Sequence, residues 1–441
     1  MTRMVASLFA LILSTLLLVA GNAFLMTLLG IRLGLEAVDP GTIGRVLACY
    51  SVGFVLGTLS VHRVIGRVGH IRAFAVFAAI TAVAALLYPL ALSMALWAGL
   101  RVLSGFAMAG LLVVIESWFS SRATSSNRGA LFAVYQIVFF ISVASGQLLV
   151  NLGDPADFPL YTLSAILLTL ALIPLSLTRM DAPVVVAAER ISIFQLLRES
   201  TTGVAGSLTC GLLIGSFYAL GPVYATLIGL DLARTSAFMA TAIIAAMILA
   251  WPMGMICDRF DRRRVMFTLA LIAGVAACVA AFTGIHHPIL LIGAVGLFTG
   301  LSAALYPIAV AITNDRMDEH RIVAASATLL LSYGLGSVMG PLLISELIGL
   351  TGPGGLFLGC AGFLALLALI VGYYIWTTED IPVAEQETFV TTMPEAMPVL
   401  AEMDPRNEEF HATEEPLMPE PAAPESRPAV PIEEEEATEP R

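Results

Sequence analysis

The 441-residue sequence contains no lysine, so all 22 of its basic residues are arginine. A Walker A phosphate loop needs a lysine on the nucleotide phosphates, which excludes ATP hydrolysis by this chain alone. A lysine Schiff base to retinal or to another carbonyl cofactor is excluded for the same reason.

Charge of either sign is also scarce. Charged residues make up 12% of the chain and hydrophobic residues 58%, and the mean hydropathy is +0.90. Soluble domains typically hold about a quarter charged residues. We therefore expect lipid, and not water, to surround most of this chain.

Paired cysteines are absent too. The five cysteines, at positions 49, 210, 257, 278 and 360, stand singly, without a C-x-x-C pair or a matching histidine spacing. This pattern predicts no disulfide framework, no metal site and no cofactor. No apolar run combines a nucleophile with a nearby histidine and aspartate, so we do not expect an enzyme.

Twelve apolar windows are long enough to span a bilayer. We predict spans at 5–29, 42–61, 72–92, 95–116, 130–150 and 160–177, then at 204–227, 236–256, 265–282, 289–312, 323–347 and 356–376. The expected domains are a six-helix bundle over 1–178, a cytoplasmic linker over 179–199 and a second six-helix bundle over 200–377. A cleaved signal peptide over 1–29 is disfavoured, because its apolar run is too long and its removal would leave an odd number of spans.

Arginine is distributed unequally between the two sides that these spans define. Fifteen arginines fall in loops, ends and linker on one side and three on the other, with Arg101 left inside a span. The positive-inside rule then predicts that both termini and the linker are cytoplasmic.

The last segment, 378–441, differs in composition from the rest. From Glu379 onward it holds 18 acidic residues and three arginines, is rich in proline and has no apolar periodicity. We expect a disordered cytoplasmic tail. Such a tail is either a solvated appendage or a docking site for a cytoplasmic partner. Within the linker, 191–199 is either an amphipathic segment at the membrane interface or a plain connector.

A loop motif recurs in the two halves. Gly254 to Arg263 reads GMICDRFDRR, and a weaker copy, GTLSVHRVIGR, runs from Gly57 to Arg67 with His62 where the other has Asp258. The repeat predicts two related halves. It resembles the loop motif of the major facilitator superfamily, over residues 1 to about 377. That resemblance implies an all-α integral membrane protein with 12 transmembrane helices in two pseudo-symmetric six-helix bundles.

The same resemblance implies a gating latch at these loops that stabilises the outward-facing state. We expect Asp258 to accept backbone N–H bonds at the start of the next helix, and Asp258→Asn to favour the inward-facing state; a positive-inside anchor is the alternative. Buried Glu116 is expected to pair with Arg63 or Arg128, with proton carriage as its alternative role. The expected latch residues are Glu116, His62, Arg63, Arg67, Arg128, Gly254, Asp258, Arg259, Arg262 and Arg263.

A central cavity is the second expected site. Arg101, in Arg-Val-Leu-Ser-Gly, resembles the family's R-x-x-x-G signature of the fourth helix, which implies that it faces the cavity; snorkelling to the outer interface is the alternative. Further cavity candidates, each of which could equally bond a neighbouring helix, are Asn22, Gln136, Gln147, Tyr218, Tyr224 and Tyr306. Tyr306-Pro307, Gly221-Pro222 and Gly340-Pro341 are expected to interrupt helices.

The segments VVIESW at 113–118 and LLLSYGLGS at 329–337 resemble the YcaD-type subgroup of this family. The resemblance implies a secondary transporter in a bacterial inner membrane, which moves a small solute by alternating access, with proton coupling left open. The few charges favour an amphipathic or weakly anionic solute over a sugar. The expected partners are this solute, protons and membrane lipid, and no nucleic acid. The alternative is a non-transporting receptor or scaffold that signals through the acidic tail.

Overall fold

The computed structural model describes residues 2–123, 127–177, 191–284, 287–317 and 321–378, with residues 382, 383, 386 and 389. Every regular element in these ranges is helical, and twelve spans among them are long and apolar enough to cross a membrane. The predicted fold class is therefore confirmed. Most of the predicted tail and most of the predicted linker lie outside the described residues.

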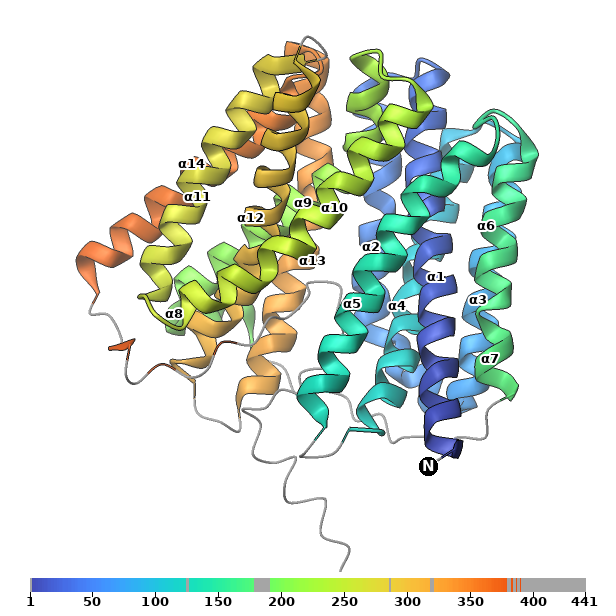
Figure 1. Cartoon of the computed structure of the whole chain (residues 1–441), viewed down its shortest axis with the longest axis horizontal. Helices are drawn as coiled ribbons and strands as arrows, with labels where there is room; N and C mark the ends of the chain where they lie inside the picture. The colour runs from blue at the N-terminus through green and yellow to red at the C-terminus, as the bar shows by residue number, and fades with distance from the viewer. Residues whose placement is uncertain are drawn as a thin grey trace, which may run out of the picture.

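The helices form two bundles (Figure 1). The first contains α1 (Thr2–Leu35), α2 (Pro40–Val68), α3 (His70–Leu87), α4 (Met94–Ser120), α5 (Arg128–Leu148) and α6 with α7 (Phe158–Leu170, Leu172–Leu177), plus the short η1 (Tyr88–Leu90) and η2 (Leu149–Leu152). The second contains α9 (Thr201–Leu227), α10 (Leu232–Cys257), α11 (Arg262–Thr283), α12 (Pro288–Asn314), α13 (Ile322–Thr351) and α14 (Gly355–Thr377). A short helix, α8 (Ile193–Glu199), precedes the second bundle.

Polar caps set several helix starts beyond the apolar windows. Asp39 precedes α2 and accepts a hydrogen bond from the Thr42 amide, with Pro40 in the first turn. Asp231 and Asp261 cap α10 and α11 in the same way. An aspartate that accepts a free N–H of the first turn stabilises the helix start.

Prolines lie inside four of the long helices without ending them. Pro222, Pro252, Pro307 and Pro341 fall within α9, α10, α12 and α13. The helices therefore continue past all three positions where an interruption was expected. In a membrane, a helix continues past a proline because neighbouring groups satisfy the freed backbone.

The two ends of the molecule differ. One end, here named the arginine-rich end, carries Arg67, Arg128, Arg259 and Arg321 at helix termini, and α1 begins there (Figure 1). Close contacts between the bundles lie towards the opposite end, where Gly30 meets Pro222 and Gly34 meets Thr226.

Within the first bundle, α2 and α4 approach to backbone contact. A Cβ atom on Gly53 of α2 would overlap the carbonyl oxygen of Val102, and one on Gly105 of α4 would overlap that of Tyr50. Only glycine fits where helix backbones come this close. These two helices therefore form one closely packed pair.

Candidate functional site: the cavity between the bundles

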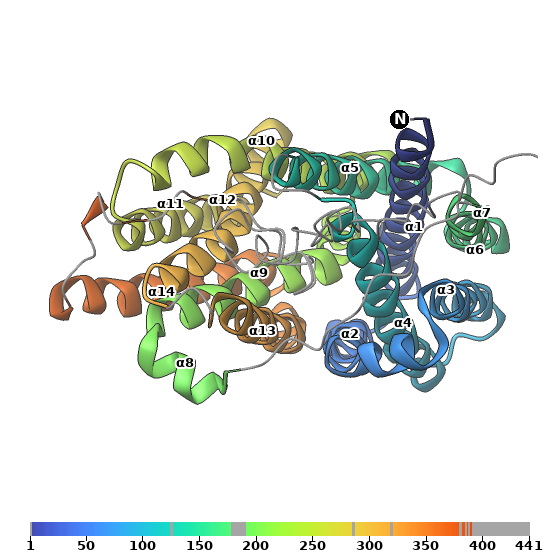
Figure 2. The same ribbon diagram turned by 90° about the horizontal axis from the view of Figure 1, so that it is seen from below.

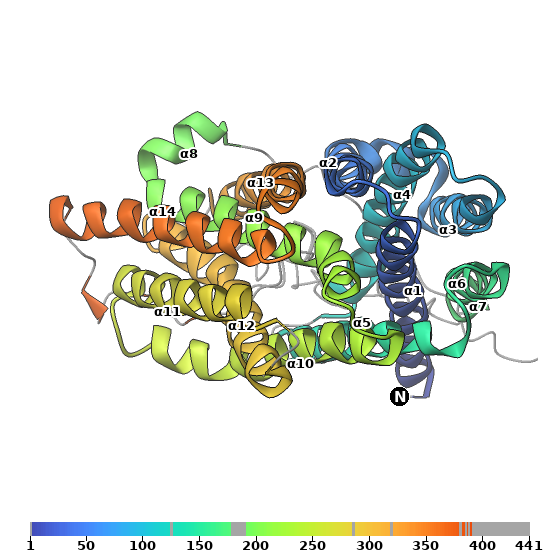
Figure 3. The ribbon, with the colours of Figure 1, turned by 90° about the horizontal axis from the view of Figure 1, so that it is seen from above.

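Three helix pairs make most of the described contact between the bundles: α1 with α9, α2 with α13, and α5 with α10. Views along the bundles show these pairs around the middle of the molecule (Figures 2 and 3). A cavity of about 140 Å³ lies between them, with walls from both bundles. Its polar and aromatic lining residues are Asn22, Thr27, Tyr50, Ser51, Phe54, Phe139, Gln147, Tyr218, Tyr333 and Ser337.

Two side-chain pairs build the polar wall on the first bundle. Asn22 of α1 donates to the hydroxyl of Tyr50 on α2 over 3.2 Å. Thr27 of α1 donates to Oε1 of Gln147 on α5. The Gln147 amide also brings an NH2 donor group to this wall. Asn22, Gln147 and Tyr218 lie at the cavity as expected, whereas Tyr50 and Thr27 were not anticipated.

Arg101 of α4 lies directly behind this wall. Its side chain is 1% exposed, so it does not snorkel to the surface. Its guanidinium carbon sits 4.4 Å from the centroid of the Tyr50 ring, and Nη2 lies 2.7 Å from Sδ of Met26. Tyr50 and Met26 both line the cavity. Arg101 therefore supports the cavity wall and is not part of its surface.

The remaining cavity candidates lie elsewhere. Tyr224 packs in the core of the second bundle, with its hydroxyl 3.4 Å from the Ala280 carbonyl and its ring 4.9 Å from that of Phe357. Its expected place in the cavity is therefore wrong. Tyr306 stands behind the lining residue Tyr333, with ring centroids 5.7 Å apart. Gln136 is buried on α5 outside the lining.

The expected latch of the first half centres on Glu116. Its carboxylate is fully buried and accepts a 2.7 Å hydrogen bond from the hydroxyl of Tyr135 on α5. The expected partner of Glu116 was an arginine, Arg63 or Arg128, and the tyrosine was not anticipated. Arg128 is buried, His62 is half-buried, and Arg63 and Arg67 are exposed at the arginine-rich end.

In the second half, the described contacts of the latch arginines stay within their own bundle. Arg262, 1% exposed, pairs with Asp315 at the end of α12. Arg263 donates to the carbonyls of Tyr374 and Thr378. Arg259 is exposed. These contacts therefore fix α11 to α12 and α14 in this state.

Asp258 does not have the expected partner. Its carboxylate accepts the backbone N–H of Phe389 over 2.8 Å, and a Cβ on Gly254 would lie 3.3 Å from the Phe389 ring. The helix-start role belongs to Asp261, which accepts the Arg264 amide. The prediction that Asp258 caps the next helix is therefore wrong by three residues, because the motif holds two aspartates at cap-compatible positions.

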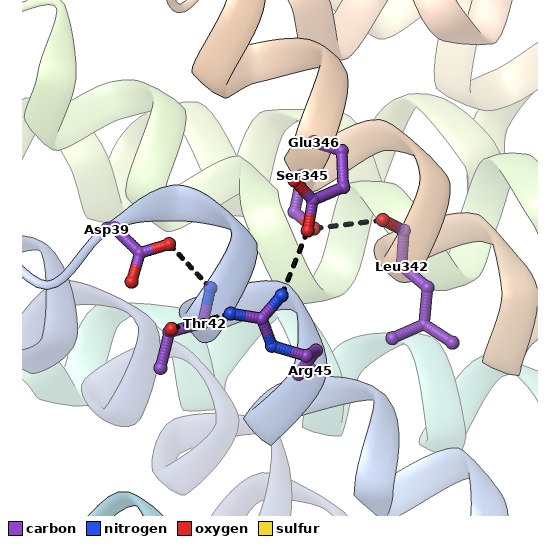
Figure 4. A network of polar contacts seen from close by, with 6 residues as sticks. All are labelled: Asp39, Thr42, Arg45, Leu342, Ser345 and Glu346. Atoms are coloured by element: carbon purple, nitrogen blue, oxygen red, sulfur yellow. Dashed lines mark hydrogen bonds and ion pairs between the residues drawn. The ribbon is translucent and has the colours of Figure 1, made fainter.

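The opposite end is closed by contacts that were not predicted from the sequence. Arg45 of α2 donates to Glu346 of α13 over 3.0 Å and to Thr42 over 2.8 Å (Figure 4). Asn151 of η2 donates to Ser236 of α10 over 2.6 Å. A signal existed, because Arg45 and Glu346 are charged residues inside two of the predicted spans.

Comparison with known proteins agrees with this architecture. The family model described as Major Facilitator Superfamily matches residues 4–252 and 209–390. The MFS-type transporters YcaD of Escherichia fergusonii and of Escherichia coli K12 (strain DH10B) are 30% and 31% identical over 331 residues, covering 74% of this chain and 85% of each relative.

Solved structures share the fold. The nucleoside transporter NupG has a TM-score of 0.71 at 16% identity, covering 86% of this chain and all of the other. A bacterial homologue of the lysosomal transporter Spinster, in an inward-facing and occupied conformation, has a TM-score of 0.70 at 12% identity, covering 87% and 98%. With two six-helix bundles around a shared cavity and these matches along its length, the chain belongs to the Major Facilitator Superfamily.

Proposed function

We propose that this membrane transporter moves a small solute across the bacterial inner membrane by alternating access, with one bundle rocking against the other around the cavity. One observation carries the proposal: the cavity has walls from both bundles, and the described contacts that close it lie towards one end. A binding module without transport needs no such one-sided closure.

The arginine-rich end is assigned to the cytoplasm, with both termini on that side. The support is the excess of arginine in its short loops, which retains such loops in the cytoplasm. The present state is then inward-facing, because Arg45 and Glu346 join the bundles at the periplasmic end.

Within the proposed cycle, Asn22, Gln147 and Tyr218 contact the solute. Gln136 and Tyr306 belong to the layer behind the wall. The latch residues act at the arginine-rich end when the bundles meet there in the outward-facing state. The proposed cycle includes proton coupling, which remains to be tested. The candidate proton carrier is Glu116, whose carboxylate accepts the hydrogen bond from Tyr135.

The deciding experiment begins with a thermal-shift screen of the purified protein against metabolites and drugs at two pH values, because a ligand of the native state stabilises it. Compounds that stabilise the protein are then tested for counterflow in proteoliposomes. We expect saturable counterflow, and an apparent affinity for the solute that falls at least 10-fold in Asn22→Ala and in Gln147→Ala. Phe194→Ala, on the exposed face of α8, is the control and should leave this affinity unchanged.

Three results separate the alternatives. Specific binding without counterflow would favour the receptor reading. Loss of counterflow on truncation after residue 378 would show that the acidic tail is more than an accessory. Failure of an imposed pH gradient to drive net accumulation of a solute that shows counterflow would contradict proton coupling.

A further inference from the structure

The cavity has an unusual electrostatic setting. Its lining residues in the described part of the chain carry no charge, and one cation, Arg101, lies behind its wall. The ring of Tyr50 separates the guanidinium from the cavity, at 4.4 Å from guanidinium carbon to ring centroid. Since a charge in a low-dielectric surrounding is poorly screened, its field extends through one aromatic ring into the cavity.

No described acidic side chain neutralises this cation. The guanidinium of Arg101 contacts the Tyr50 ring and the Met26 sulfur, which are both uncharged, and its Nε has no hydrogen-bond partner in the described structure. Glu116, on the same helix, is 15 residues away, about 22 Å at the helical rise, and bonds Tyr135. Buried charges are normally paired, so Arg101 leaves a positive potential that an incoming group can compensate.

The shape of the lining supplies the second half of the argument. Apart from its polar residues, the lining consists of apolar and aromatic side chains such as Phe54, Met108 and Phe139. We propose that the solute is a small organic anion with an apolar body. Its anionic group lies at the first-bundle wall near Asn22 and Gln147, and its apolar part lies against these side chains. This inference rests on the proposed function.

The potential can be measured without knowing the solute. Ser51 lines the cavity, and Ser51→Cys in a Cys49→Ser background places a thiol there. Its modification rates by a sulfonate-bearing and by an ammonium-bearing methanethiosulfonate reagent are compared with those at Phe194→Cys, which is exposed on α8. We expect the anionic-to-cationic rate ratio to be at least 10-fold higher at position 51 than at position 194.

The source of the potential is tested with charge variants of the same protein. Arg101→Gln is expected to remove the preference, and Arg101→Lys to keep it. An equal ratio at both positions, or a preference that survives Arg101→Gln, would overturn the proposal. If Arg101→Gln does not fold, the ratio in the parent protein and in Arg101→Lys still decides.

The solute class is tested with pairs of carboxylates and their neutral amides, such as 4-methylpentanoate with 4-methylpentanamide and phenylacetate with phenylacetamide. We expect the carboxylate of a pair to stabilise the protein at a concentration at least 10-fold lower than the amide. Equal or better binding of the amides, or no binding of any carboxylate, contradicts the anion. Counterflow of the amides would support the proposed transport function and contradict the anionic solute. Selective binding of the carboxylates without counterflow would support the anionic solute and contradict transport.

Discussion

The guanidinium of Arg45 on α2 lies 3.0 Å from the carboxylate of Glu346 on α13, a contact that joins the two bundles across 301 positions of sequence. Both side chains are more than half exposed. The pair lies beside Gly41, where a Cβ would come within 2.6 Å of the same carboxylate. Closure of this end thus combines an ion pair with close helix packing.

Breaking this pair should favour the state open at the periplasmic end. An exposed ion pair contributes roughly 0.2–1 kcal/mol, which changes a conformational ratio about 1.4- to 5-fold. Glu346→Ala and Arg45→Ala should each produce this change, and the swap Arg45→Glu with Glu346→Arg should restore the balance. Spin-label distances between the periplasmic ends of α2 and α13 give the measurement; unchanged distance populations in both single variants would contradict the gate.

Gly44→Ala should have a larger effect. A Cβ at this position would overlap Oγ of Ser345 and lie 2.6 Å from the carbonyl oxygen of Pro341, so the backbones cannot keep their present approach. We expect the same labels to report a population shift of more than 10-fold towards the open periplasmic end. Gly99→Ala is the matched control, because nothing lies within 4 Å of its added Cβ.

The buried pair of Arg262 and Asp315 should matter for stability. Removing one partner of a buried ion pair leaves an uncompensated charge and costs about 3–5 kcal/mol. Asp315→Ala should therefore lower the free energy of unfolding by that amount, seen as a marked fall in Tm in detergent. Glu346→Ala, which removes one partner of an exposed pair, serves as the control. A Tm loss no larger than that of the control would show that Asp315 is compensated elsewhere.

The contact of α8 with α13 should weaken in acid. Burial raises the pKa of Glu199, but hydrogen bonds from Arg321 and Gln195 and the Arg321 charge outweigh it, so the pKa lies below its ordinary 4.5. A depressed carboxyl pKa contributes stability that is complete above the unfolded value and is lost as pH falls through the folded value. Hydrogen exchange at 193–199 should thus increase, after correction for intrinsic rates, only below about pH 4.5. In Arg321→Ala the increase should already be present at neutral pH, and protection unchanged from the parent there would contradict this contact.

The spans could be predicted because hydropathy alone determines which segments lipid accepts, and each predicted window falls mostly within one observed helix or helix pair. Helix ends could not be predicted as well. Helices such as α2 continue past the apolar window to the polar cap of Asp39 at one end and to Val68 at the other. Hydropathy reports the thickness of the hydrocarbon layer, whereas the helix ends where its backbone groups find other partners.

The candidate site shows a different limit. Polar residues within spans, such as Asn22 and Gln147, attract attention in a sequence, but their direction depends on which helix face meets which neighbour. Tyr224 has the same chemistry as Tyr218 and points into the bundle core. Pairings such as that of Arg262 with Asp315, which join residues 53 positions apart, depend on packing that no local pattern contains.

The glycine contacts between α2 and α4 have a mechanical consequence. Because Gly53 and Gly105 leave no room between the two backbones, these helices must move as one body. That body carries Arg45 at the end opposite the arginine-rich end, and Arg101 with Tyr50 further inside. In the proposed rocking motion, the gate and the cation that we propose attracts the solute travel together, so the charge stays with the first bundle in whichever direction the cavity opens.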